Sequence, residues 1–178
     1  LLYIQPIAQS IKKGFGVDDS SLSLLVSVGS LSSSVAFILL TYILATKGVK
    51  FSLSVGLFLL FAGTVVELCI QEHFNLVYLG HYITHHGIPI LNIANAKFCS
   101  IWFTPKVRPL AITLNAMTSS FGIMIAFIIP GIFVDGNTSL DSETIKSQVR
   151  NFHIFLVCAY GTLLLVSVFF FKEAPANY

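Results

Sequence analysis

The chain has 178 residues, of which 55% are hydrophobic and 10% are charged, and its mean hydropathy is +0.84. Soluble domains carry about 25% charged residues, so this composition excludes an ordinary soluble protein and predicts a membrane protein. The net charge of +2 is too small to indicate a protein that binds nucleic acid.

Apolar segments follow one another along the chain, and a spanning helix needs about 20 mostly apolar residues. The segments are long and do not alternate between polar and apolar residues, which predicts helices rather than the strands of a barrel. No signal peptide precedes the first segment, so we expect a fragment or a trimmed product that begins inside a helix. The predicted spans are residues 1–10 (partial), 21–45, 51–70, 74–102, 109–134 and 151–171.

The charges of the loops give the expected orientation. The loops with Lys47 and Lys50, and with Lys106 and Arg108, are short and basic, whereas those on the other side mix acidic and basic residues. Lys and Arg alone are nearly even between the two sides, but the shortness of the basic loops favours the cytoplasmic side for them.

Serines repeat along one face of the second span, at Ser23, Ser27, Ser30 and Ser34. Small residues let two membrane helices approach closely, so we expect this face to pack against another helix. The alternative is that it lines a polar cavity.

The fourth span carries a polar stripe. At 100° per residue, His81, His85, Asn92 and Asn95 fall on one side of the helix, while His86 lies off the stripe. Lipid does not tolerate such a stripe, so it must face other helices or water. Three interpretations stay open: hydrogen bonding between helices, a path for substrate or protons, and a pair of metal or haem ligands.

Helix-breaking residues accompany the polar ones. Pro89 is expected to kink the fourth helix one turn after His85, and broken polar helices near the midplane are common in transporters. In the fifth span Asn115 shares a face with Ser119 and Gly122, and Asn115 is the residue expected to face a cavity.

Several stretches resemble a known family. A basic loop between the second and third helices and a fifth helix with Gly and Pro resemble the N-terminal half of a major facilitator transporter. Within that superfamily, "LLYIQPIAQSIKKGFGVDDSSLSLL", "ILNIANAKFCSIWF" and "VRPLAITLNAMTSSFGIMIAFIIPGIFV" are similar to the feline leukaemia virus subgroup C receptor-related family. The resemblance covers nearly the whole chain. It implies an all-α integral membrane fold, a six-helix bundle with helix 1 truncated, as one domain over residues 1–178.

The resemblance also implies a gating loop, formed here by Gly48, Lys50 and Arg108. Ala45 stands where the superfamily normally has an Asp that helps to hold the cytoplasmic gate closed, so we expect altered gating. Members of the narrower family are associated with choline, ethanolamine or haem. A choline site needs aromatic walls, of which Tyr3 would be one, while Trp102 lies at the wrong end of the bundle.

We therefore expect a solute-carrier transporter that works by alternating access against a second six-helix bundle on the same or another chain. The alternative is a non-transporting structural subunit of a large membrane complex, derived from a facilitator. We expect no enzyme, no cofactor and no metal site, because no nucleophile, phosphate loop or metal cluster is present. The plasma membrane is the expected location and the mitochondrial inner membrane the alternative, with lipid and a small solute as partners. The predicted pathway residues are Tyr3, Gln5, His81, His85, Asn92 and Asn115.

Overall fold

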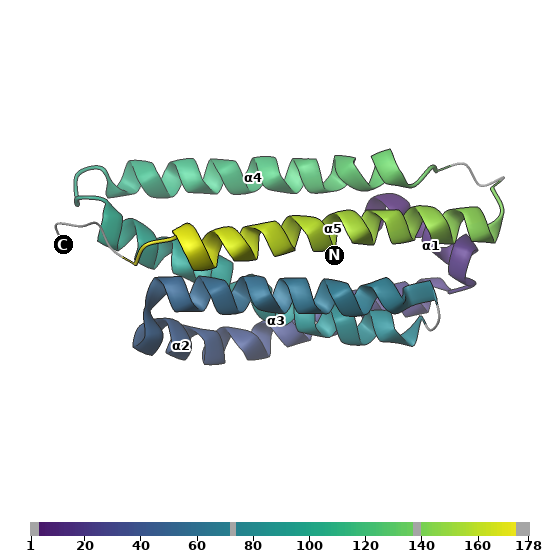
Figure 1. The fold of residues 1–178 in the computed structure, drawn as a ribbon, viewed down its shortest axis with the longest axis horizontal. Helices are drawn as coiled ribbons and strands as arrows, with labels where there is room; N and C mark the ends of the chain where they lie inside the picture. Colours follow the sequence, from purple (N-terminus) through teal and green to yellow (C-terminus); the bar gives the residue numbers. More distant parts are fainter. Residues whose placement is uncertain (1–3, 72–73, 137–139, 174–178) are drawn as a thin grey trace.

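The protein is described from a computed structural model that covers residues 4–71, 74–136 and 140–173. These residues form helices, and no strand occurs among them, which confirms the prediction of a helical protein (Figure 1). The elements are the 3-10 helix η1 (Gln5–Ile7), α1 (Ala8–Phe15), α2 (Asp19–Glu67), the 3-10 helix η2 (Leu68–Gln71), α3 (Asn75–Trp102), α4 (Arg108–Phe133) and α5 (Ser142–Phe170).

The helix α2 contains two of the predicted spans, 21–45 and 51–70, joined without a loop. Gly48 has φ 85° and ψ −179°, a conformation that residues with a side chain rarely adopt, and the helix bends there. Figure 1 shows the two halves of α2 running beside each other in opposite directions. The expected loop is therefore a tight turn that a single glycine makes.

The start of the chain also differs from the prediction. Helix α1 continues to Phe15, beyond the expected end of the first segment at residue 10, and Gly16 ends it in the left-handed conformation with φ 64°. Glycine at this position is a common helix stop because it has no side chain to clash. Part of the predicted linker is therefore helical.

Three helices among the described residues are long and apolar enough to cross a membrane: α2, α4 and α5. Helix α3 is not among them, and its interior carries the histidines and asparagines of the polar stripe. The count of six spans stays a prediction.

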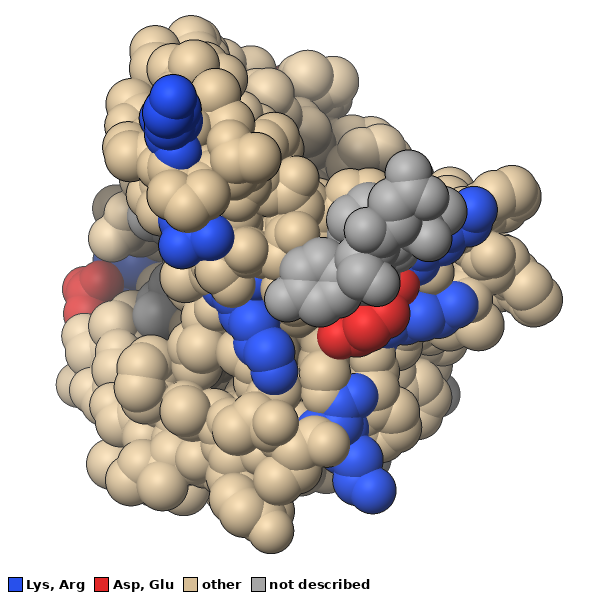
Figure 2. Space-filling view, turned by 90° about the vertical axis from the view of Figure 1, so that its left-hand side faces the viewer, with Lys and Arg blue, Asp and Glu red and all other residues tan. Residues whose placement is uncertain are grey.

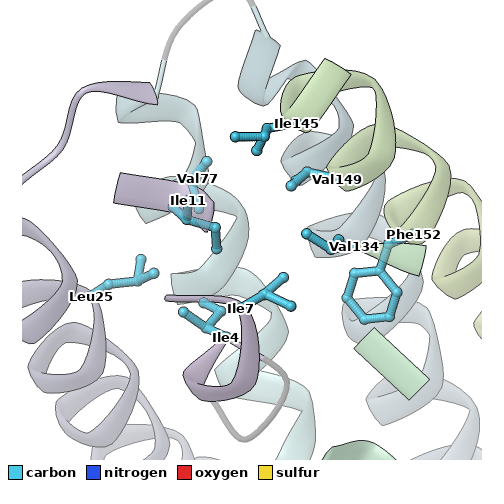
Figure 3. Close-up of a cluster of buried hydrophobic side chains, with 9 residues drawn as sticks. All are labelled: Ile4, Ile7, Ile11, Leu25, Val77, Val134, Ile145, Val149 and Phe152. Carbon is cyan, nitrogen blue, oxygen red and sulfur yellow. The ribbon is translucent and has the colours of Figure 1, made fainter. Parts of the chain in front are cut away.

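Nine buried apolar side chains join the ends of the helices (Figure 3). They come from the N-terminal helices, from α2, α3 and α5, and from the residue after α4, so one cluster holds together segments that are far apart in the sequence. Burying apolar side chains in contact at one end fixes how the helices enter the bundle. The cluster consists of Ile4, Ile7, Ile11, Leu25, Val77, Val134, Ile145, Val149 and Phe152.

Glycines bring α3 close to the second half of α2. A Cβ atom on Gly63 would lie 2.6 Å from the carbonyl oxygen of Gly80, and one on Gly87 would lie 2.5 Å from that of Gly56. No side chain fits at either crossing, so the two backbones touch directly, which maximises van der Waals contact between apolar helices.

The first half of α2 packs on α3 through a different face from the expected one. Ser23, Ser27, Ser30 and Ser34 are exposed, and the hydroxyls of the last three donate to carbonyls one turn back in their own helix. Among the described residues this stripe does not pack against another helix, contrary to the prediction, and Ser34 lines the hollow that also contains Asn92. The buried positions are instead Leu25, Gly29, Ser32, Ala36, Leu40 and Leu44.

Charged residues gather at the two ends of the bundle. The Gly48 turn, the loop between α3 and α4 and the end of α5 share one end in Figure 1, and Figure 2 shows that Lys and Arg outnumber Asp and Glu on the described surface there. At the opposite end Asp18 and Asp141 cap α2 and α5. Hydrogen bonds from the side chain and N–H of Ser21 hold the pKa of Asp18 below its usual value, and those from Thr144 do the same for the pKa of Asp141.

Candidate functional site

Three ionisable side chains meet in the interior of the bundle. Glu67 comes from the end of α2, His81 from α3 and His153 from α5, and they are 1%, 1% and 3% exposed. His81 Nδ1 lies 3.4 Å from Glu67 Oε1, and His153 Nε2 lies 3.6 Å from Glu67 Oε2. We call these three residues the Glu67 centre. An ionisable group buried in a membrane bundle is costly, which makes this centre a candidate functional site.

Glycine makes room for the carboxylate. A Cβ atom on Gly80 would lie 2.6 Å from Glu67 Cγ, so only a residue without a side chain lets Glu67 pass α3 and reach His81. The last turn of α2 then continues directly into η2. Local sequence thus positions the acid against the histidine.

His81 also contacts the second predicted histidine. The rings of His81 and His85 lie with their centroids 4.3 Å apart. His85 Nδ1 is 3.1 Å from Ser33 Oγ, and Ser33 Oγ donates to the His85 carbonyl oxygen at 3.0 Å. Because the single serine proton goes to the carbonyl, His85 Nδ1–H is the donor to Ser33. This contact joins the first half of α2 to α3, as the interpretation of bonding between helices requires.

The remaining predicted pathway residues lie elsewhere. Asn92 lines an open hollow of about 470 Å³ together with Ser33, Ser34 and Pro89. Asn115 and Asn95 line a separate hollow of about 490 Å³ between α3 and α4. Gln5 is exposed, and Tyr3 lies outside the described residues. The structure therefore brings His81 and His85 together but does not gather all six residues in one pocket.

Sequence reasoning missed Glu67 and His153. Both carried a usable signal, since Glu67 is an acid inside "FAGTVVELCI" and His153 lies in the apolar run "NFHIFLVC". The rule that an intramembrane ionisable residue marks a functional site would have selected them. Within the described ranges, no group of three or more His, Cys, Asp or Glu residues has a geometry suited to a metal ion.

The predicted gating loop has a specific geometry. The carboxylate of Glu173, beyond the end of α5, accepts hydrogen bonds of 2.6 Å from the backbone N–H groups of Val49 and Lys50. These donors begin the second half of α2, directly after Gly48. An acid from a distant segment thus caps the turn, in a loop that has Ala45 at the expected position of an acid.

Two cations bond to the ends of helices at the same end of the bundle. Arg108 Nη2 donates to the carbonyl oxygen of Ser100 at 3.0 Å, and Lys97 Nζ donates to that of Leu44 at 2.6 Å. Carbonyls at a helix C-terminus carry partial negative charge, so both contacts are favourable. Together with Glu173, they connect the ends of α2, α3, α4 and α5.

Apolar helices with charged loops at both ends and an ionisable centre inside define a multi-pass integral membrane protein of the transporter class. The chain belongs to the Major Facilitator Superfamily, whose family model matches residues 2–178. A search of curated proteins gives no match. The family acts in membranes on small solutes, and the resemblance to the feline leukaemia virus subgroup C receptor-related family stays a prediction.

Proposed function

We propose that residues 1–178 form the N-terminal transmembrane bundle of a transporter that moves a small solute by alternating access. The observation that carries this proposal is the family match over residues 2–178, which favours transport over a structural subunit. Transport needs a second six-helix bundle, on the same or another chain, against which this one rocks. The plasma membrane is the proposed location.

The face for the second bundle includes α4. Only 6% of the apolar segment of α4 is buried, and the hollow beside it combines the amides of Asn95 and Asn115 with apolar walls from Phe98 and Leu114. An apolar cavity with a few convergent polar groups is the usual form of a site for a small molecule. This hollow is the proposed solute site, and the separate hollow at Asn92, beside α2, is a second proposed part of the solute path.

Uptake tests this function. The full-length native protein is reconstituted in liposomes and supplied with labelled choline, ethanolamine or haem, the solutes that the family resemblance suggests. Asn115→Ala removes the amide in the hollow and should reduce uptake at least tenfold. Asn151→Ala makes the same change at an exposed position in the third turn of α5 and should leave uptake unchanged.

Two outcomes would contradict the proposal. Uptake equal to that of empty liposomes for a broad panel of small solutes would argue against transport. Equal uptake by Asn115→Ala and the wild type would argue against this hollow as the solute site. Thermal unfolding of each variant shows whether the fold is intact.

A further inference from the structure

The geometry of the Glu67 centre requires a shared proton, as the contacts of His153 show first. His153 Nδ1 lies 2.8 Å from the carbonyl oxygen of Val149. A carbonyl oxygen only accepts hydrogen bonds, so Nδ1 carries a proton. In a neutral ring the other nitrogen, Nε2, then has a lone pair, and this is the nitrogen that faces Glu67 Oε2. The lone pair of His153 Nε2 and the carboxylate of Glu67 repel each other, and they attract only when one of the two groups carries a proton.

Charge leads to the same conclusion. With one such proton, the carboxylate of Glu67 and one imidazolium cancel, and the centre is neutral. Without it, a single negative charge remains at a site where Glu67 is 1% exposed, and with a second proton the centre becomes positive. Buried charges are tolerated when they are paired, so the state with one proton is favoured in the closed bundle.

The ligand that fits this centre is a proton rather than a metal or alkali cation. Hard cations prefer several oxygen ligands, and the centre has one carboxylate. Zinc does accept two histidines and a glutamate, but within the part of the chain that the structure describes these three residues do not have a geometry suited to a metal ion. Both nitrogens of His81 lie without a hydrogen-bond partner among the described residues, and Nδ1 faces Glu67 Oε1 at 3.4 Å. His81 is therefore a second place where the proton can reside.

Other titratable groups surround Glu67 on each neighbouring element. On α3, His85 contacts the ring of His81, and on α5, Tyr160 lies close enough to interact electrostatically with Glu67. Cys69, just after α2, is exposed. From His85 the hydrogen bond to Ser33 leads to the open hollow that Ser33 lines with Asn92. Polar groups thus connect the centre with a place that water can reach.

We propose that Glu67, His81 and His153 form a proton-binding centre that gains and loses one proton as the bundle opens and closes, and so couples solute movement to protons. The coupling rests on the proposed transport function, whereas the centre itself does not. On release, the N–H bond of the imidazolium breaks, the electron pair stays on the ring nitrogen, and the proton passes to water in the hollow. Glu67 then keeps one negative charge.

Spectroscopy of the full-length protein in lipid tests the centre. Nitrogen NMR of protein with 15N-labelled histidine distinguishes imidazolium from neutral rings, and infrared difference spectra detect a protonated carboxylic acid. The proton should be visible by one of the two methods at neutral pH and should disappear on titration to alkaline pH. Glu67→Gln should remove the signal, while Glu143→Gln, which removes an exposed carboxylate, should retain it. His153→Gln provides a second variant should Glu67→Gln fail to fold, and it should move the signal to His81, the remaining nitrogen partner of Glu67.

Two results would overturn the centre: wild-type spectra without a signal that Glu67→Gln removes or His153→Gln moves, or a signal that persists at every pH at which the protein stays folded. The second result describes a permanent ion pair. Uptake driven by a pH gradient tests the coupling separately. Uptake that occurs but does not respond to the gradient overturns the coupling alone, and absence of any uptake contradicts the transport function while the spectra still decide the centre.

Discussion

Replacing Glu173 with alanine should loosen the turn at Gly48. The Glu173 carboxylate accepts 2.6 Å hydrogen bonds from the N–H groups of Val49 and Lys50, the first donors of the second half of α2. A side-chain cap stabilises a helix by about 1 kcal/mol, and a hydrogen bond to a charged group contributes about 1.5–3 kcal/mol. Because Glu173 is exposed, screening reduces the sum, and we expect a loss of about 2 kcal/mol in the free energy of unfolding.

Denaturant unfolding followed by the fluorescence of Trp102, the single tryptophan of residues 1–178, measures this loss. The matched control is Glu143→Ala, which removes an exposed acid that pairs with its neighbour Lys146 and should cost about 0.3 kcal/mol. Glu173→Gln keeps an acceptor without the charge and should fall between the wild type and Glu173→Ala. Equal stability of Glu173→Ala and Glu143→Ala would refute the view that this carboxylate caps the turn.

Two further predictions concern packing and pH. Gly63→Val places a side chain 2.6 Å from the Gly80 carbonyl oxygen and should destabilise the protein by about 1–3 kcal/mol. Its control, Gly122→Ala, adds a methyl group in open space and should leave the stability nearly unchanged. Unfolding midpoints measure both effects, and equal effects would contradict the close crossing of the helices. The second prediction concerns the Asp141 cap, where hydrogen bonds from Thr144 lower the folded-state pKa below 3.8. Its stabilisation is therefore present above the unfolded pKa and lost as pH falls through the folded pKa. The difference in unfolding midpoint between wild type and Asp141→Ala should shrink in acid, and a constant difference would contradict this reasoning.

The sequence was sufficient to predict helices, their approximate bounds and a face of the fourth span, with His81 and His85, that is turned away from lipid. Long apolar runs leave few alternatives, because a lipid environment requires every backbone group to be bonded within the chain. The turn at Gly48 was visible only as a short basic loop, since sequence does not reveal that one positive φ angle suffices to reverse the helix.

The serine pattern of the first half of α2 did not identify the face of the helix that packs. In lipid, apolar and small polar residues are both tolerated on a surface, and a hydroxyl can donate to its own helix, as Ser27 and Ser34 do. The packing face instead contains Gly29 and Ser32. Gly29 leaves room for the ring of His85, and the hydroxyl of Ser32 donates to the carbonyl oxygen of Tyr82.

The sequence predicted the candidate site as a polar stripe along one helix, whereas the structure shows a cluster of side chains from three helices. His81 and Asn92 share a side of α3, but eleven residues separate them by about 16 Å along the axis, too far for one small pocket. Glu67 and His153 complete the centre from other helices, and only the tertiary fold brings them to His81. A stripe on one helix therefore identified its face but not its partners.

Water access at Asn115 from both sides of the membrane tests alternating access most directly. In a full-length protein without its native cysteines, Asn115→Cys is exposed to a membrane-impermeant thiol reagent, first from one side and then from the other. We predict labelling from either side, with the balance shifted by solute, and no labelling of Leu163→Cys on the exposed apolar surface of α5. Labelling of Asn115→Cys from one side only, with or without solute, would contradict the account.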